Sequence, residues 1–204
     1  MQQIRIEPVT KTKFRIYLDG EFAFVLYKSE LARYGIKDGG EISDEMAAKI
    51  KEETVLKRAR VKALKLLGDM DRTRAELKDR LMRSDFTEEI AELALAYADS
   101  FGYLNDERYV ENYVQSRKET KSRREICAEL SRKKVDREIV ERVLEDCYGA
   151  DDSCTAILKL LKKRHYDAEQ MDQKEKQKIC AWLARKGFRY GEIRKAMELP
   201  DWED

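Results

Sequence analysis

Alternating apolar and polar positions near the start of the chain predict β-strands. Phe14, Ile16 and Leu18 alternate with other residues, and Asp19-Gly20 suits a two-residue type I′ turn that returns the chain over residues 21–26. Because a lone hairpin is only marginally stable, we expect a third strand from Gln2 to Val9 and a helix packed on one side. The turn also sets the expected register: Leu18 opposite Glu21, Ile16 opposite Ala23 and Phe14 opposite Val25, with Tyr17, Phe22 and Phe24 together on the other face.

A helical period replaces this alternation further along the chain. A short helix is expected from Ser29 to Tyr34, ended by Gly35, and a longer one after the N-cap residue Ser43. We expect the longer run to end at Gly68, because its apolar positions follow a 3.6-residue spacing up to that point: Leu56, Ala59, Ala63, Leu64 and Leu67.

The helical part of the sequence repeats at intervals near 50 residues. Thr73-x-x-Glu76 and Ser122-x-x-Glu125 read as capping boxes 49 residues apart, and each precedes the same spacing of apolar residues. A third copy, shifted by a further 53 residues, is less regular and shows no capping box at residues 175–178. The equivalent positions are Leu81, Leu130 and Leu183; Phe86, Val135 and Phe188; Arg83, Arg132 and Arg185; and Cys127 and Cys180. The last helix of the first copy is expected to be lined by Ile90, Leu93, Ala94 and Tyr97.

These repeats define the predicted fold class. We expect a mainly α protein, a tandem array of three three-helix repeats that is elongated, with a small N-terminal α+β region that contains the β-hairpin. The expected segments are 1–54 for the hairpin region and its connecting helix, 55–104 for the first repeat, 105–150 for the second and 151–204 for the third.

Charge is abundant in the chain but almost balanced. Lys and Arg number 42 and Asp and Glu 41, which gives a net charge of +1 and excludes a generic polycation. No run approaches the roughly twenty apolar residues that cross a bilayer, and the start lacks the pattern of a secretory signal, so we expect a cytoplasmic protein without membrane association. We also expect a monomer. Four Cys without a C-x-x-C pair and one His indicate no zinc site and no disulfide framework, and the Cys are interpreted as small buried residues.

Basic residues are nevertheless grouped locally. Residues 54–68 hold five basic groups and no acid, residues 117–134 hold eight basic groups against three acids, and a third group surrounds residues 159–164. Such runs are often solvated helix faces, but their recurrence in a repeat array favours a contact surface for phosphates or acidic protein. The candidate contact residues are Arg72, Arg74, Arg117, Lys118, Lys121, Arg123, Arg124, Arg132, Lys133, Lys134, Lys162, Lys163, Arg164, Arg185 and Lys186.

Catalytic chemistry has little support in the sequence. His165 is the sole histidine, follows a basic run and suits the end of a helix, and Gly39-Gly40 lacks the spacing of a phosphate-binding loop. We therefore expect no catalytic residue, no cofactor and no metal.

Three motifs are distinctive: residues 100–109 (SFGYLNDERY), 71–77 (DRTRAEL) and 185–188 (RKGF). They resemble motifs of the RecX family, the bacterial regulators of RecA recombinase. The sequence departs from the family at Asp85 and Lys134, where a Gly more usually precedes the apolar residue. Independently of the resemblance, Gly102 suits a left-handed helix end, Asn105 suits the cap of the next helix, and Tyr103 and Leu104 are expected to fill the corner between repeats.

The resemblance implies a non-enzymatic modulator that binds the RecA filament on single-stranded DNA and inhibits its growth, ATP hydrolysis and strand exchange, with weak binding to double-stranded DNA. The alternative is a stand-alone helical-repeat nucleic-acid-binding protein, in which tyrosines near the basic groups stack on unpaired bases. The tyrosines considered are Tyr109, Tyr113, Tyr148 and Tyr166, of which Tyr109 and Tyr113 are expected to face inward.

Overall fold

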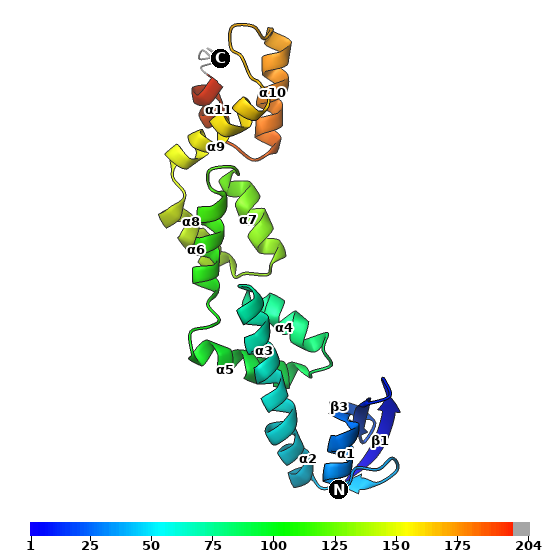
Figure 1. The fold of residues 1–204 in the computed structure, drawn as a ribbon. Coiled ribbons are helices and arrows are strands. Elements are labelled where there is room, and N and C mark those ends of the chain that lie inside the picture. Colours follow the sequence, from blue (N-terminus) through cyan, green and yellow to red (C-terminus); the bar gives the residue numbers. More distant parts are fainter. Residues whose placement is uncertain (198–204) are drawn as a thin grey trace. The chain divides into compact units, whose positions relative to one another are not determined.

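The computed structural model describes residues 1–197, which form two compact units, one from Met1 to Asn105 and one that begins at Asp106 (Figure 1). The chain is mainly helical and has a small N-terminal strand region, as predicted. The predicted segment boundaries and the predicted elongation stay predictions, and the last seven residues of the third segment, 198–204, lie outside the described residues.

The N-terminal sheet is antiparallel, with strand order β3-β2-β1-β4. The third strand that the pattern predicted is present as β1, whereas β4 is only two residues long and gives no alternation to recognise. The strands are β1 (Gln2–Pro8), β2 (Lys13–Leu18), β3 (Glu21–Tyr27) and β4 (Glu41–Ile42).

A β-bulge in the hairpin shifts the predicted register by one residue. Asp19 and Gly20 both have positive φ, 49° and 88°, as a type I′ turn requires. The irregularity lies at Ile16 and Tyr17, and it places Phe24 beside Ile16 instead of on the opposite face. Phe24 and Ile16 are each 1% exposed, so the bulge brings a large aromatic ring into the core. The predicted pairs Ile16 with Ala23 and Phe14 with Val25 are wrong, and the structure pairs Ile16 with Phe24 and Phe14 with Leu26.

Helices connect the sheet to the first repeat. Gly35, with φ 65°, ends the first of them, and the Ser43 side chain accepts a hydrogen bond from the backbone of Met46 at the start of the second, as predicted. Gly68 does not end the long run, because its backbone stays helical and the helix continues to Asp69. The elements are α1 (Lys28–Tyr34), α2 (Asp44–Ile50), the π-helical turn η1 (Lys51–Leu56) and α3 (Lys57–Asp69).

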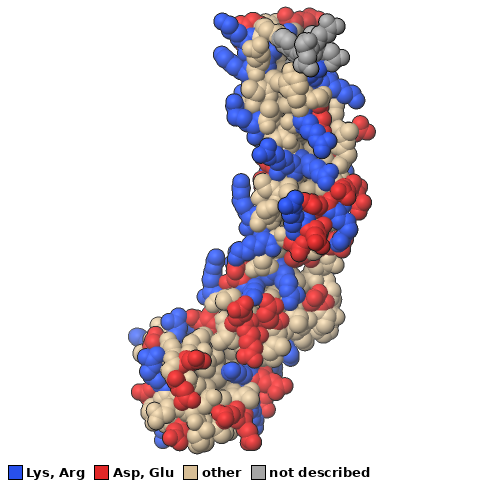
Figure 2. All heavy atoms as spheres, turned by 180° about the vertical axis from the view of Figure 1, so that it is seen from behind, with Lys and Arg blue, Asp and Glu red and all other residues tan. Residues whose placement is uncertain are grey.

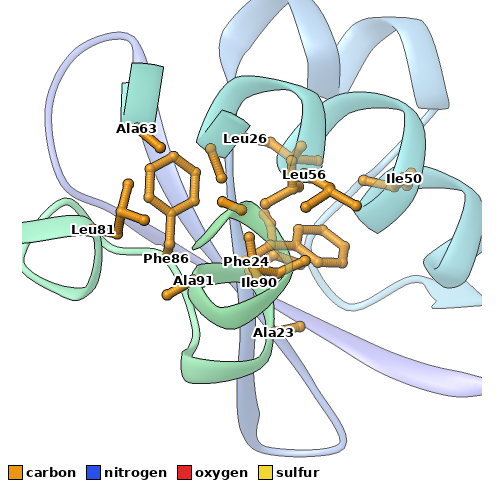
Figure 3. Close-up of a cluster of buried hydrophobic side chains, with 14 of the residues drawn as sticks. Ala23, Phe24, Leu26, Ile50, Leu56, Ala63, Leu81, Phe86, Ile90 and Ala91 are labelled. Carbon is orange, nitrogen blue, oxygen red and sulfur yellow. The ribbon is translucent and has the colours of Figure 1, made fainter. Parts of the chain in front are cut away.

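The π-helical turn changes which residues of this run are buried. A π-turn holds one residue more than an α-turn and so rotates the face that follows it. Val55 and Leu56 are both buried next to β3, and Leu66 is buried in α3 where Leu64 and Leu67 were expected. Figure 3 shows Leu56 and Ile50 beside Phe24 and Leu26 of the sheet.

The first repeat adds α4 (Arg74–Met82) and α5 (Glu88–Ser100) to α3. The Thr73–Glu76 capping box forms, and Leu77 and Leu81 are fully buried. In α5, Leu95 is buried and Leu93 is 46% exposed, so the prediction that Leu93 lines the core is wrong. Phe86, at the corner between α4 and α5, lies near Ala63 and Leu81 in the same core (Figure 3).

The second and third repeats each enclose a core of their own. The Ser122 side chain accepts from the Glu125 backbone as predicted, but Glu125 does not complete the box. The third repeat does have a capping box, formed by Asp172 and Glu175, three residues earlier than the repeat spacing suggested. The elements are α6 (Asp106–Arg117), α7 (Arg123–Arg132) and α8 (Arg137–Cys147), then α9 (Ala150–Lys163), α10 (Gln173–Arg185) and α11 (Tyr190–Met197).

All three repeats turn the same left-handed corner before their last helix. The residues at this position are Asp85 with φ 63°, Lys134 with φ 56° and Gly187 with φ 93°. Asp85 and Lys134 therefore take the same left-handed conformation as Gly187, although it carries a steric cost for a non-glycine residue. The apolar residue that follows is buried in every repeat: Phe86, Val135 and Phe188.

The segment after α5 forms only part of the predicted joint. Gly102 has φ 68° and Leu104 is buried, as expected. Tyr103 does not fill the corner: it is 56% exposed and stacks on Phe101, with ring centroids 5.9 Å apart.

The four Cys are free and partly exposed, whereas they were expected to be buried. Cys127 and Cys180 lie beside the buried stripe of their helices and not on it.

Candidate functional site

Some of the predicted contact cations bind groups of the fold itself, and others are exposed to a binding partner. In the first repeat, both predicted residues bind neighbouring elements. The guanidinium of Arg72 donates to the carbonyl of Leu66 at 3.2 Å, and that of Arg74 pairs with Glu92 at 3.0 Å and Asp99 at 3.7 Å. These two arginines position helices.

Three cations between α6 and α7 are likewise engaged. Lys121 binds Glu129, Arg117 lies 3.7 Å from the same carboxylate, and the Tyr113 hydroxyl donates to it at 2.8 Å. Partial burial acts to raise the pKa of Glu129, but the hydrogen bonds from Lys121 and Tyr113 outweigh it, and the net pKa is below the ordinary value. Lys118 reaches Asp152 of α9 at 3.3 Å and so connects the second repeat to the third.

Tyr109 and Tyr113 are half-buried and stack on each other, with ring centroids 6.1 Å apart. Arg117 lies over the Tyr113 ring at 4.2 Å and Lys133 lies 5.4 Å from the Tyr109 ring. Tyr109 and Tyr113 therefore face inward only in part: they pack against the core of the second repeat, and cations lie over their outer side. Tyr148, by contrast, is buried and donates its hydroxyl to the Lys121 carbonyl at 2.9 Å, so it offers no stacking face.

A groove runs between α7 of the second repeat and α10 and α11 of the third. It consists of two adjoining clefts of about 750 and 540 Å³ that share Arg124, Ala128, Ala184 and Gly187. We call this feature the α7–α10 groove. Its cations are Arg123, Arg124, Arg185, Lys186 and Arg189, its acids are Glu125, Glu141, Glu145 and Glu192, and its apolar floor includes Leu144 and Phe188.

The groove cations are unequally engaged. Within residues 1–197, Arg124 and Arg185 are exposed and form no ion pair, and the nearest carboxylate to Arg123 is Glu145, at 4.0 Å. Lys186 lies 3.6 Å from Glu125. Arg189 is likewise exposed and forms no ion pair in that range, so Arg124, Arg185 and Arg189 are the groove's available positive charges. On the face drawn in Figure 2, Lys and Arg side chains gather in the upper part of the molecule, at the height of α7 to α10 in Figure 1.

A hydrogen bond and a close packing contact fix the groove walls. The Ser122 hydroxyl donates to the Lys186 carbonyl at 2.6 Å. Gly187 packs so tightly that a Cβ there would lie 2.8 Å from the Cβ of Arg124. The start of α7 and the end of α10 are therefore held against each other at Ser122 and Gly187.

The remaining predicted cations lie outside the groove. Arg132 is exposed and forms no ion pair within the described range, while Lys133 and Lys134 occupy the left-handed corner after α7. Lys162 and Lys163 are exposed in the last turn of α9, and Arg164 follows them, stacked on Trp182 of α10.

Arg189 is the groove cation that the sequence reasoning missed. The repeat spacing contained its signal, because the equivalent positions in the first two repeats are the N-cap residues Thr87 and Asp136. An arginine cannot accept the capping hydrogen bond that threonine or aspartate accepts. A basic residue at a position otherwise used for capping therefore indicates another role.

No helix among residues 1–197 is long and apolar enough to cross a membrane. No set of three or more His, Cys, Asp or Glu residues in that range is arranged to hold a metal ion.

The repeats, their shared corner and the α7–α10 groove define a tandem three-helix-repeat protein. Comparison with known proteins agrees at each repeat: the models of the first, second and third three-helix domains of RecX match residues 59–97, 105–144 and 150–197. The chain belongs to the RecX family.

Individual relatives extend the similarity to the whole chain. Regulatory protein RecX of Caldanaerobacter subterraneus subsp. tengcongensis is 31% identical over 92% of this chain and 93% of its own. The crystal structure of RecX from Lactobacillus salivarius is 27% identical, with a TM-score of 0.59 over 70% of this chain and 94% of that one. A crystal structure of regulatory protein RecX, 24% identical with a TM-score of 0.66, covers 97% of this chain and 99% of that one and has the same fold.

Proposed function

We propose that this chain is a non-enzymatic cytoplasmic modulator of RecA, which binds as a monomer to the RecA filament on single-stranded DNA and inhibits its growth, ATP hydrolysis and strand exchange. The observation that carries the proposal is the RecX match over all three repeats. The relative from Caldanaerobacter is named a regulatory protein, in keeping with a role without catalysis.

The α7–α10 groove is the proposed filament contact. The basic runs of all three repeats were predicted to contribute to this contact, but Arg117, Lys118 and Lys121 of the second repeat already neutralise carboxylates of the fold. Arg124 and Arg185 do not, and a new anionic partner would not have to displace an existing one. Binding by these two residues avoids the cost of breaking an internal ion pair.

The near-neutral charge of the chain supports local, shape-dependent contact. With a net charge of +1, the chain has no long-range attraction that would collect it on any DNA. Both cations and carboxylates line the groove, which suits a protein surface with both signs of charge better than a uniform row of phosphates.

The direct test follows RecA ATP hydrolysis on single-stranded DNA while this protein is added at well below one copy per RecA. We expect inhibition at these substoichiometric amounts, because a molecule bound to a filament affects many RecA subunits at once. Inhibition only when the protein is in large excess over DNA would indicate competition for DNA and would contradict the proposal.

Charge reversal tests the contact surface. Arg124→Glu, alone and combined with Arg123→Glu, is expected to weaken filament binding without lowering the melting temperature, because both positions lie in the first turn of α7, where the helix dipole favours acids. Lys28→Glu is the matched control, because Lys28 lies in the first turn of α1, is exposed and forms no ion pair within residues 1–197. Equal filament affinity in the Arg124 variant and the control would remove the groove from the proposal.

The alternative, a stand-alone nucleic-acid-binding protein, rests on the Tyr109–Tyr113 stack and its covering cations. Salt separates the two functions. Binding through phosphates weakens steeply as salt rises, whereas binding to a protein surface of mixed charge depends less on salt. Tight binding of bare single strands with a steep salt dependence, without any effect on RecA, would favour the alternative.

A further inference from the structure

The third repeat carries a cation–π pair that the groove does not include. The guanidinium carbon of Arg164 lies 4.0 Å from the centroid of the Trp182 ring. Trp182 is half-buried against the core of α9, α10 and α11, while Arg164 is exposed. The exposed guanidinium therefore lies on an indole ring that the core holds in place.

The chain around Arg164 is held from both sides. α9 ends at Lys163, His165 takes the left-handed conformation with φ 53°, and the Tyr166 backbone N–H bonds to the Leu161 carbonyl at 3.0 Å. The Tyr166 hydroxyl donates to the carbonyl of Met197 at 3.2 Å. This corner reverses the chain and directs Arg164 back over α10.

Unpaired positive charge surrounds the pair. Lys162, Lys163 and Lys178 are exposed, and none of them, nor Arg164, forms an ion pair within residues 1–197. Lys178 precedes Trp182 by one helical turn and so shares its face of α10. Arg117, Lys118 and Lys121, by contrast, are neutralised by carboxylates of the fold. We call Lys162, Lys163, Arg164, Lys178 and Trp182 the Trp182 cluster.

The chemistry of the cluster matches one kind of ligand. A guanidinium is planar, stacks on rings and donates in a fixed fork to phosphate oxygens. When one of its faces lies on an indole, the opposite face remains open for a nucleobase, and Arg planes and aromatic rings are the surfaces on which unpaired bases stack. The flanking lysines supply flexible charges for a phosphodiester backbone.

We propose that the Trp182 cluster is a subsite for single-stranded nucleic acid, in which a base stacks on Arg164 and the lysines contact the neighbouring phosphates. The inference rests on the proposed function and deepens it, because it assigns DNA to the third-repeat corner and the protein part of the filament to the α7–α10 groove. A duplex, whose bases are already stacked, lacks the free base face that this site would use.

The first experiment uses Trp182 as its own reporter. The chain has two Trp, and the full-length Trp202→Phe variant retains only Trp182. Its emission is followed without RecA, at low salt, during titration with oligothymidylate, with a duplex of equal length and with inorganic polyphosphate. We expect a saturable change of emission with oligothymidylate that duplex and polyphosphate do not reproduce. An unchanged emission at saturating oligothymidylate, or an equal response to all three ligands, would overturn the proposal.

The second experiment measures affinity by the anisotropy of labelled oligothymidylate. Arg164→Gln is expected to weaken binding about tenfold, the order of one base stack, and to reduce the slope of log affinity against log salt by about 0.7. Arg164→Lys, which keeps the charge and loses the plane, should fall between this variant and the unmodified chain. Arg137→Gln, which removes the same charge from an 85% exposed position of α8, should change affinity less than about twofold.

Equal losses in the Arg164→Gln and Arg137→Gln variants would overturn the subsite, since a general charge effect would explain both. The two proposals also fail separately. A chain that responds to oligothymidylate as expected but leaves RecA ATP hydrolysis unchanged keeps the subsite and loses the proposed function. Inhibition of RecA without a response of Trp182 would keep the proposed function and overturn the subsite.

Discussion

The Ser122 hydroxyl donates a 2.6 Å hydrogen bond to the carbonyl oxygen of Lys186, and the Ser122 Oγ itself accepts from the Glu125 backbone N–H at 3.0 Å. One side chain, 1% exposed, therefore caps the start of α7 and satisfies a carbonyl at the end of α10. Besides this bond, the second and third repeats share the ion pairs Lys118–Asp152, Lys159–Glu119 and Lys186–Glu125, the buried Tyr148–Ser153 hydrogen bond and the Gly187 contact. Ser122 is one of the buried polar links between them.

Replacement of Ser122 by Ala is expected to lower the free energy of unfolding by about 1–3 kcal/mol, because a helix cap and a buried hydrogen bond are lost together. Chemical denaturation measures the change. Ser131→Ala is the matched control, since Ser131 is exposed and its hydroxyl bonds only to the Cys127 carbonyl of its own helix. Equal effects of the two substitutions would show that Ser122 does not connect the repeats.

Gly187→Ala is expected to destabilise the chain by about 1–3 kcal/mol, for reasons of both conformation and space. The position has φ 93°, and a new Cβ would lie 2.8 Å from the Arg124 Cβ and 2.9 Å from the Ser122 Oγ. Gly191→Ala, inside α11 with no atom within 4 Å of the added Cβ, should instead stabilise by about 1 kcal/mol through helix propensity. Thermal melts should show a lower melting temperature for Gly187→Ala and a higher one for Gly191→Ala than for the unmodified chain.

The corner before the last helix shows why the repeat could be predicted from the sequence. The step from Leu81 to Phe86 recurs from Leu130 to Val135, and both partners are buried in each repeat. Burial of these two apolar residues on one core forces the chain to reverse within the residues between them. The reversal therefore persists where the usual glycine is replaced by Asp85 or Lys134.

The features that could not be predicted depend on distant partners. The bulge near Ile16 and the π-helical turn at residues 51–56 depend on how the sheet packs on α3. No local sequence pattern indicates this packing. The same holds for the candidate site. A basic run reveals that cations are present, but the partner of Lys118 is Asp152, 34 positions away, and only the fold shows that Lys118 is engaged while Arg124 is available.

Asp85 gives a pH-dependent prediction. Hydrogen bonds from Lys13, at 2.6 Å, and Arg15, at 2.7 Å, hold the pKa of this carboxyl below its ordinary value. A carboxyl whose pKa is lowered in the folded state stabilises the fold above the unfolded pKa of about 3.9, and this contribution disappears as pH falls through the folded value.

The Asp85→Asn variant isolates this charge, because Asn tolerates the left-handed backbone of the position. We expect it to unfold about 1–3 kcal/mol more easily at neutral pH, with the difference from the unmodified chain shrinking as pH drops below 4. Asp146→Asn, at an exposed position with no ion pair in the described part of the chain, should show no such convergence. Urea denaturation at a series of pH values tests the pair, and parallel curves for Asp85→Asn and the unmodified chain would contradict the assignment.

Leu183→Ala is expected to lower stability by about 2–5 kcal/mol, as a cavity in a closed core does. Leu183 is fully buried among residues of its own repeat, so amide exchange should accelerate mainly between residues 150 and 197 while the sheet of β1 to β3 stays protected. Leu158→Ala, at a 51% exposed leucine of α9, should cost less than about 0.5 kcal/mol. Uniform loss of protection over the whole chain would mean that the repeats do not unfold separately.

The three cores also differ in how much chain each one needs, which bears on how the protein forms during synthesis. The second core draws on residues from Val110 to Tyr148 and the third on residues from Ala156 to Met197, roughly 40 each, so their contacts are short in sequence and quick to close. The first core extends from Ile4 to Leu104, because the strands pack on helices translated much later. On the ribosome the N-terminal unit must therefore wait for α5, and each later repeat can complete its core soon after it emerges.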